Sequence, residues 1–440
     1  MTNVSVDHAA VRGRRIVLSM VTGLPAFGLQ VVGGLLLVTL AWRTLGADGF
    51  GLWSAITAFG PIVALGDLGV GSALISVVAS AMGRDDSLAA RRVVATAIVV
   101  SMTGALLLTA LLVVACALLD WQAWFNLPPT TPYAPALGVV VYAGCRLLLL
   151  PLGMVAKLRT GLQENFVNNA WDAAGVCLSV GLFYIASRSG AGLPVLLLAS
   201  GAGPVLAACG NWLGLVGRNV IPRPRDLDIS ELRPLLRLGV LFFALNLSML
   251  LSNAADNLMA VRLLGTAATA ELAVANKIFT VGQAVLNVAL IPLWPAFAEA
   301  IARRDGRWIR RALQFSLAAS CGAGTVLSAG FVLCANPAVA LWLGPEATLS
   351  AGILWANAAW LVLQANGIVL AMFLNGAGVV RFQVVQALCF GLLAFGLKLL
   401  LASPFGAAGI VWATVVAYVA TVLPFYLWFI RRWLARADWA

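Results

Sequence analysis

The chain has 440 residues, of which 62% are hydrophobic and 10% are charged, and its net charge is +11. Soluble domains are about half apolar and about a quarter charged, so this composition excludes an ordinary soluble protein. The basic residues form no aromatic-interleaved surface, and the net charge therefore does not indicate nucleic-acid binding. The apolar residues instead form runs that are long enough to cross a hydrocarbon core about 30 Å thick.

Twelve such runs follow one another along the chain. We expect spans at 16–42, 50–82, 93–119, 136–156, 166–187, 194–217, 238–261, 271–301, 312–335, 350–374, 383–402 and 407–430. The first run is too long for the core of a signal peptide and lacks a clean cleavage site, so it is predicted to be a span. The sequence therefore predicts an all-α integral membrane protein with twelve transmembrane helices.

The distribution of basic residues predicts the orientation of these spans. If the N-terminus is inside, most of the 28 Lys and Arg residues fall in cytoplasmic segments, and only Arg43, Arg188 and Arg262 fall in segments on the opposite side. Cytoplasmic loops of membrane proteins carry an excess of Lys and Arg. We therefore expect a multi-pass membrane protein with both termini in the cytoplasm.

The two halves of the chain resemble each other at an offset of 219 residues, which relates Arg43 to Arg262. The same offset relates Asp86, Arg91 and Arg92 to Asp305, Arg310 and Arg311. Each half holds six spans, so both halves start on the same side and the repeat is parallel. The pattern predicts an N-terminal six-helix bundle at 1–217, a cytoplasmic linker at 218–237 and a C-terminal six-helix bundle at 238–440, around a central cavity. This architecture suits transport by alternating access, and a channel or scaffold is the alternative.

Nothing in the sequence indicates a catalytic centre, a metal site or a cofactor. The seven Cys residues lie singly, mostly in apolar runs, and no CxxC pair is present, which is typical of small buried side chains. The only histidine, His8, lies in the polar N-terminal tail. A catalytic or metal centre built on histidine is therefore excluded. No loop is large enough for a soluble catalytic domain and no ATP-binding motif is present. We therefore expect a protein that is not an enzyme and that draws its energy from an ion gradient or from the substrate gradient.

Basic side chains within or beside the spans are the candidate substrate-binding residues. A charge inside the bilayer is costly unless it is paired or faces water. Arg146 and Lys277 lie within spans, and Arg43 and Arg262 lie at the ends of spans. Fixed cations in a central cavity would attract an anionic head group, and Arg can bind phosphate bidentately. The pattern therefore favours an anionic cargo.

Three carboxylates within the spans are candidates for ion coupling, namely Asp256, Asp67 and Asp172. A carboxylate in a water-filled cavity can carry a proton or bind Na⁺. A structural ion pair or a position at a helix end explains Asp67 and the intramembrane Lys398 equally well.

Several short segments resemble one family. The segment from Arg43 to Trp53, RTLGADGFGLW, is similar to the RxLGxxxfGxw pattern that follows the first span of bacterial polysaccharide flippases. The segment DLGVGSALI that begins at Asp67 resembles their DLGxxxAL stretch, and NxxDxxM around Asp256 precedes a similar AxANK segment ending at Lys277. The chain thus resembles the O-antigen or repeat-unit flippases of the multidrug/oligosaccharidyl-lipid/polysaccharide exporter superfamily. It departs from them at Leu272, where the family often has Tyr.

The resemblance implies a function. Such proteins move an undecaprenyl-pyrophosphate-linked oligosaccharide from the inner to the outer leaflet for surface polysaccharide biosynthesis. Coupling to a proton or Na⁺ is the usual proposal, with Asp256 and Asp67 as matching candidates, and other polysaccharide-assembly proteins are possible partners.

Two alternatives stay open at this point. A cation-coupled multidrug or metabolite antiporter of the same superfamily would be expected to have a cavity of acids and aromatics. A membrane-embedded polymerase or glycosyltransferase would need clustered carboxylates or large outward loops, and the predicted outward loops are short.

Overall fold

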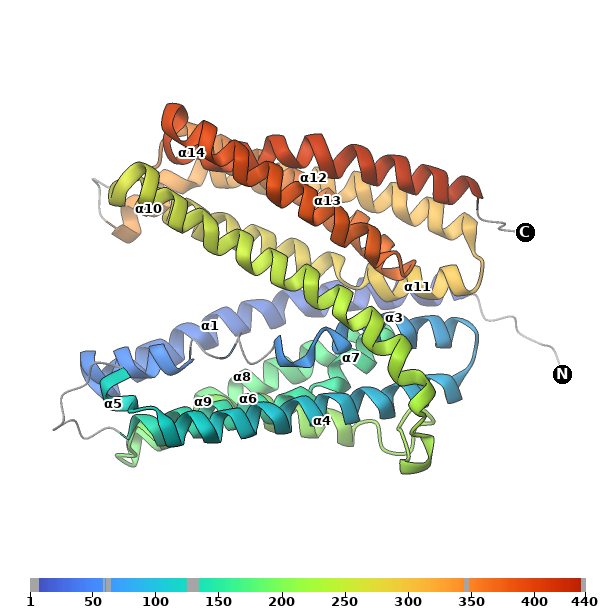
Figure 1. Cartoon of the computed structure of the whole chain (residues 1–440), viewed down its shortest axis with the longest axis horizontal. Coiled ribbons are helices and arrows are strands. Elements are labelled where there is room, and N and C mark those ends of the chain that lie inside the picture. Colours follow the sequence, from blue (N-terminus) through green and yellow to red (C-terminus); the bar gives the residue numbers. More distant parts are fainter. Residues whose placement is uncertain (1–7, 58–59, 61–64, 125–133, 344–347, 437–440) are drawn as a thin grey trace. The chain divides into compact units, whose positions relative to one another are not determined.

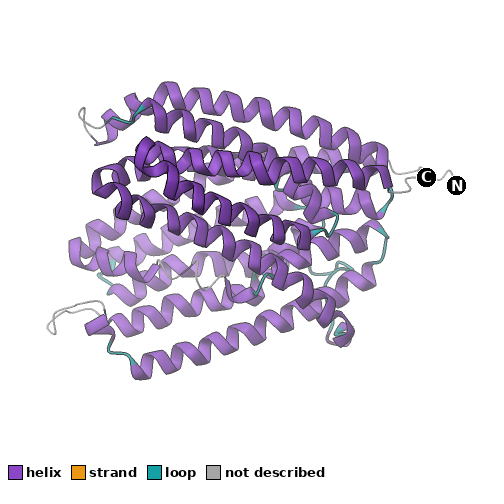
Figure 2. Ribbon diagram, turned by 45° about the horizontal axis from the view of Figure 1, so that its top comes forward, coloured by secondary structure: helices purple, strands orange, loops and turns teal. Residues whose placement is uncertain are grey.

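The computed structural model describes residues 8–57, 60, 65–124, 134–343 and 348–436. These residues form helices joined by turns and short loops, and no strand occurs among them (Figures 1 and 2). The chain divides into two compact units, Met1–Phe242 and Phe243–Ala440.

The described part of the first unit consists of α-helices and short 3₁₀ elements (Figure 1). In chain order they are α1 (His8–Thr57), η1 (Leu65–Asp67), α3 (Val70–Gly83), α4 (Ser87–Leu118), α5 (Trp121–Trp124), α6 (Pro135–Leu152), α7 (Met154–Gly161), α8 (Asn165–Arg188), α9 (Leu193–Leu213), η2 (Pro224–Asp226) and η3 (Ile229–Glu231).

The second unit continues from α10 (Leu232–Leu290), which begins in the first unit and whose ribbon turns back on itself in Figure 1. The helices that follow are α11 (Leu293–Ala302), α12 (Gly306–Leu343), α13 (Ala351–Gly376) and α14 (Val380–Arg436).

The helices account for the predicted spans. Within the described residues, nine helices are long and apolar enough to cross a membrane. Two long helices are interrupted by glycines with positive φ, α1 at Gly46 (φ 66°) and α14 at Gly406 (φ 59°). Such backbone is readily adopted only by glycine, and it divides α14 between the two spans predicted there. The all-α fold class is confirmed, and the helices are consistent with twelve spans.

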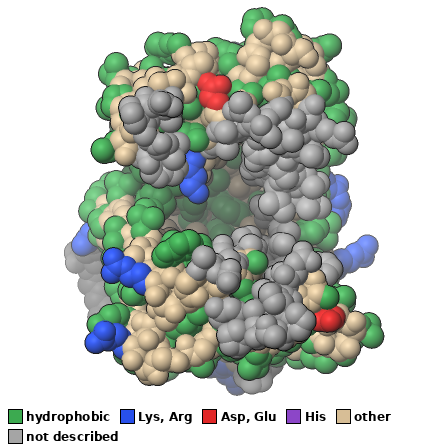
Figure 3. Space-filling view, turned by 90° about the vertical axis from the view of Figure 1, so that its left-hand side faces the viewer, with side chains coloured by type: hydrophobic (Ala, Val, Ile, Leu, Met, Phe, Trp, Pro, Cys, Tyr) green, Lys and Arg blue, Asp and Glu red, His purple; other side chains and the backbone are tan. Residues whose placement is uncertain are grey.

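The outward faces of these helices are apolar. On α4, Leu106, Leu107, Leu111 and Leu118 are each more than 60% exposed. A large apolar surface in contact with water would be unfavourable, whereas lipid solvates it. Figure 3 looks at the end that carries α5, where the described surface is mostly hydrophobic or uncharged and charged side chains are scattered.

The second predicted span, 50–82, is not one helix. The first helix ends at Thr57 and α3 begins at Val70, after a turn in which Leu68 (φ 50°) and Gly69 (φ 74°) have left-handed backbone. The carboxylate of Asp67 accepts hydrogen bonds from the amides of Gly69 (2.8 Å) and Gly71 (3.3 Å). Hydropathy alone does not detect this interruption, because the sequence stays apolar through it.

Small residues let the helices of the first unit pack closely. A Cβ atom at Gly33 of α1 would lie 2.1 Å from Val176 Cγ1 of α8, and one at Gly203 of α9 would lie 2.2 Å from the carbonyl oxygen of Gly175. Gly210 lies against the ring of Trp171, where a Cβ atom would be 2.4 Å from the indole. Backbones that approach this closely are typical of helix interfaces in membranes.

The segment that follows α9 packs against the start of α4. Arg91 and Arg92 at the start of α4 lie 3.5 Å and 3.4 Å from the carboxylates of Asp226 and Asp228. Thr96 also donates a hydrogen bond to the carbonyl oxygen of Asp228 (3.2 Å). The domain boundaries drawn from the sequence, with a separate linker at 218–237, stay a prediction.

Candidate functional site

Arg146 of α6 is half-buried inside the first unit and is held by an aromatic neighbour on its own helix. Its Nε and Nη2 donate hydrogen bonds to the Tyr142 hydroxyl at 3.1 Å and 2.7 Å. The guanidinium carbon lies 5.0 Å from the centroid of the Tyr142 ring, within the range of a cation–π interaction. Residues four apart share a helix face, which explains the contact. Tyr142 was not predicted from the sequence, although this spacing was a signal for it.

Glycine backbone lies beside this pair. A Cβ atom at Gly60 would be 3.2 Å from the Tyr142 hydroxyl and 3.3 Å from Arg146 Nε. Among the described residues, Arg146 forms no ion pair with a carboxylate. A guanidinium in an apolar helix without an acidic partner is suited to binding an anion.

The other predicted cations are less constrained. Lys277 is exposed on α10, and Arg43 is exposed on α1 just before Gly46. The side chain of Arg262 lies outside the described part of the structure. That these cations line one cavity together with Arg146 stays a prediction.

The three candidate carboxylates differ in their surroundings. Asp67 binds the two amides at the start of α3, as described above, and so has a structural role at a helix N-terminus. Asp256 of α10 forms an ion pair with Lys398 of α14. Asp172 of α8 is exposed and accepts no hydrogen bond among the described residues.

Lys157 of α7 is close enough to Asp172 for the two charges to attract each other. Its side chain also passes Gly71, where a Cβ atom would lie 3.1 Å from Lys157 Cε and 2.8 Å from Asp67 Oδ2. The sequence predicts a cytoplasmic segment for Lys157, and the structure places it on α7. Asp172 is thus the candidate carboxylate that accepts no hydrogen bond among the described residues and has a basic neighbour.

A polar network joins the ends of α7, α8 and α9. Arg159 is buried and donates hydrogen bonds to Asn211 and to Glu164 Oε2, the latter at 2.9 Å. Arg218 binds both carboxylate oxygens of Glu164 at 2.7 Å. Asn211 in turn donates to Asn168 Oδ1 (3.0 Å). The network connects three helices and the segment after α9.

The charge of Glu164 is strongly stabilised. Burial raises the pKa of Glu164, but the hydrogen bonds and charges of Arg218 and Arg159 outweigh it and hold the pKa below its usual range. A carboxylate whose pKa is depressed by folding stabilises the protein above the unfolded pKa, about 4.3 for Glu, and this stabilisation is lost as the pH falls through the folded value.

We expect Glu164→Gln to lower the free energy of unfolding at pH 7 by about 2 kcal/mol, because it replaces charge-assisted hydrogen bonds and leaves Arg159 buried without its counter-charge. Thermal unfolding of the purified protein in detergent measures this effect. The difference between wild type and variant should shrink as the pH falls below the unfolded pKa of about 4.3 and through the lower pKa of folded Glu164. Glu231→Gln, at a carboxylate without an ion pair among the described residues, is the control. Equal stability of wild type and Glu164→Gln at pH 7 would contradict the expectation.

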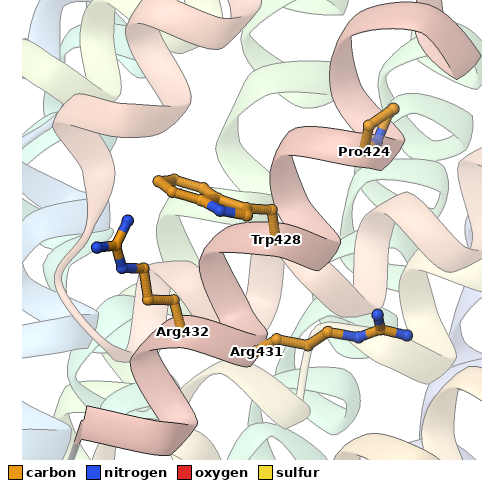
Figure 4. A pocket seen from close by; sticks show the side chains of 4 residues that line it. All are labelled: Pro424, Trp428, Arg431 and Arg432. Carbon is orange, nitrogen blue, oxygen red and sulfur yellow. The ribbon is translucent and has the colours of Figure 1, made fainter.

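A pocket lies near the C-terminal end of α14 (Figure 4). It is lined by Pro424, Trp428, Arg431 and Arg432, and the guanidinium of Arg432 lies 5.2 Å from the centroid of the Trp428 ring. Trp and Arg are common where a helix leaves the membrane, because the ring suits the interface and the charge suits the head groups. This pocket is explained by the membrane interface.

A match to a protein-family model identifies the family of this chain. The model described as "Polysaccharide biosynthesis protein" matches residues 26–301, which is more than half of the chain and includes Arg146, Asp256 and Lys277. The chain belongs to the polysaccharide biosynthesis protein family. The resemblance inferred from the sequence is confirmed. No curated protein gave a significant match to this family member.

Solved structures show the fold of this polysaccharide biosynthesis protein. It is similar to an outward-facing multidrug resistance MATE family transporter of the MOP superfamily, with 17% identity, a TM-score of 0.81 and coverage of 97% of each chain. It is also similar to MATE in complex with MaD5, with 18% identity, a TM-score of 0.82 and coverage of 99% of this chain and 100% of the other.

A third match is a MOP superfamily transporter from Pyrococcus furiosus, with 16% identity, a TM-score of 0.78 and coverage of 97% of each chain. For that transporter, the reverse polarity of the binding pocket suggests a different function. At these identities the likeness concerns the fold, which is that of MATE-type transporters.

Proposed function

We propose that the protein flips an undecaprenyl-pyrophosphate-linked oligosaccharide from the inner to the outer leaflet of the bacterial inner membrane by alternating access. The family membership and the MATE-type fold support a transporter used in surface polysaccharide biosynthesis. Both termini would lie in the cytoplasm, as the distribution of Lys and Arg indicates. The protein would act without catalysing a reaction.

The observation that carries this proposal is Arg146. It is a half-buried guanidinium in an apolar helix, oriented by Tyr142, with no carboxylate partner among the described residues. A pyrophosphate linkage offers several anionic oxygens, and a guanidinium can bind two of them at once. Lys277, Arg43 and Arg262 would add positive charge along the path of the same head group.

For coupling to an ion gradient, we propose Asp172 as the carboxylate that takes up the coupling proton or Na⁺. Asp67 is engaged by two backbone amides, and Asp256 is engaged by Lys398. The side chain of Asp172 is exposed and has no hydrogen-bond partner among the described residues, while Lys157 supplies a nearby positive charge. A carboxylate that is not occupied by protein groups is the one able to exchange a cation.

A cation-coupled multidrug or metabolite antiporter is the second candidate, and the MATE-type fold favours it as much as the first. The two differ in the charge of the cargo. Export of a cationic drug would be hindered by a fixed guanidinium, so Arg146 favours the anionic glycan.

Depletion of the protein in its native host tests the proposal. Lipid-linked glycan should accumulate in the inner leaflet, and less should be accessible at the outer leaflet, measured with an impermeant glycan-binding probe on intact spheroplasts and on lysed membranes. An unchanged leaflet distribution together with increased sensitivity to cationic drugs would support the antiporter instead.

A further inference from the structure

The ion pair between Lys398 and Asp256 joins two helices of the second unit. Lys398 Nζ donates to Asp256 Oδ1, and the two residues are 142 positions apart in the chain. The Lys398 side chain is 4% exposed and the Asp256 side chain is 22% exposed. The Lys398 side chain is therefore almost fully buried, and the Asp256 side chain is partly exposed.

Among the described residues, Lys398 has no counter-charge other than Asp256. The helix α13, which packs against α14, contains no Asp, Glu, Lys, Arg or His in its described sequence, Ala351–Gly376. Neither Lys398 nor Asp256 has a further ionic partner among the described residues. Each charge of the pair depends on the other for its neutralisation.

This dependence determines what Asp256 can do. A proton or a Na⁺ ion that bound the carboxylate would compete with the ammonium, and Lys398 would then be a buried cation without a partner. An uncompensated buried charge is strongly unfavourable, whereas removal of both charges together is tolerated. The ammonium therefore occupies the place on Asp256 that a coupling cation would take.

We propose that Lys398 is the built-in cation of Asp256, and that this carboxylate is not loaded with a proton or Na⁺ and emptied again during transport. This inference deepens the proposed function, since it excludes one candidate from ion coupling. Lys398 lies beyond the residues that the family model matches, 26–301. Because of Lys398, the Asp256 carboxylate of the motif NxxDxxM has a structural partner in this chain.

A double-mutant experiment tests the inference. Asp256→Asn, Lys398→Met and the double variant Asp256→Asn/Lys398→Met are compared for export and for amount in the membrane. Each single variant should lose export or membrane level by about tenfold or more, and the double variant should recover to within about threefold of wild type. If the double variant reaches wild-type membrane level and lacks export, Asp256 has a role that its neutral replacement cannot fill, and the proposal is wrong. Wild-type behaviour of both single variants would also overturn it.

A second measurement needs no cargo. Thermal unfolding of purified wild-type protein is recorded in NaCl and in choline chloride at equal ionic strength. The midpoint temperature of unfolding should be no higher in NaCl than in choline chloride through any effect of Asp256. The reason is that the Lys398 ammonium already occupies the carboxylate. A Na⁺-specific increase in wild type that Asp256→Asn/Lys398→Met abolishes would overturn the inference. Since no glycan is involved, this result does not depend on whether the proposed flipping activity is correct.

Discussion

Arg146→Ala is expected to reduce export of the lipid-linked glycan by about a hundredfold or more, while the protein stays in the membrane at its normal level. Charge-assisted hydrogen bonds are each worth about 1.5–3 kcal/mol, and a guanidinium makes two of them with a pyrophosphate. Each 1.36 kcal/mol corresponds to about tenfold in rate. Export is measured as glycan that appears at the outer leaflet per unit of membrane-inserted protein.

Two matched variants separate charge from geometry at this position. Arg146→Lys keeps the positive charge but removes the planar pair of donors, so it should retain part of the activity. Tyr142→Phe removes the hydroxyl that accepts hydrogen bonds from Nε and Nη2 of Arg146. It should weaken export less than Arg146→Ala does. Wild-type export by both Arg146→Ala and Lys277→Ala would refute the role of fixed cations in binding the cargo.

Asp172→Asn is expected to reduce the rate of export driven by an ion gradient by about tenfold or more. The amide cannot release a proton and binds cations weakly, so the exchange that couples transport to the gradient would stop. Movement of the cargo down its own gradient should continue. Both rates are measured in proteoliposomes with and without an imposed proton or Na⁺ gradient.

Asp67→Asn is the control for this experiment, because it removes the same charge from a carboxylate that binds the start of α3. It should lower stability by about 1 kcal/mol, as expected for a weakened helix cap, and it should leave the response to the gradient intact. An Asp172→Asn protein that still responds to the gradient would assign coupling to another group.

Features that depend on local sequence were predictable. Long apolar runs predict the helices, and the motifs around Arg43, Asp67 and Asp256 indicated the family that the model match confirmed. Intramembrane charges also identified Arg146 as a residue that needs an explanation, because burial of a charge in a span is costly wherever the fold places it.

Features that depend on tertiary packing were not predictable. Asp256 and Lys398 are far apart in the sequence, and only the packing of α10 against α14 brings their charges together. The hydrogen bonds of Asp67 to backbone amides depend on a left-handed turn at Leu68 and Gly69 that an apolar sequence does not reveal. Likewise, the partners of Arg159 are Glu164 and Asn211, which come from two separate segments, so its burial cannot be deduced from its place just after a predicted span.

The central claim concerns the cargo, and reconstitution tests it most directly. Purified protein is placed in liposomes that contain an undecaprenyl-pyrophosphate-linked oligosaccharide, and the transfer of the glycan between leaflets is followed with an impermeant enzyme that modifies exposed sugar. We expect wild-type protein to accelerate transfer well above that in protein-free liposomes, and Arg146→Ala to fall close to the protein-free rate. Transfer no faster than in protein-free liposomes, in vesicles where the same protein transports a cationic drug, would contradict the account.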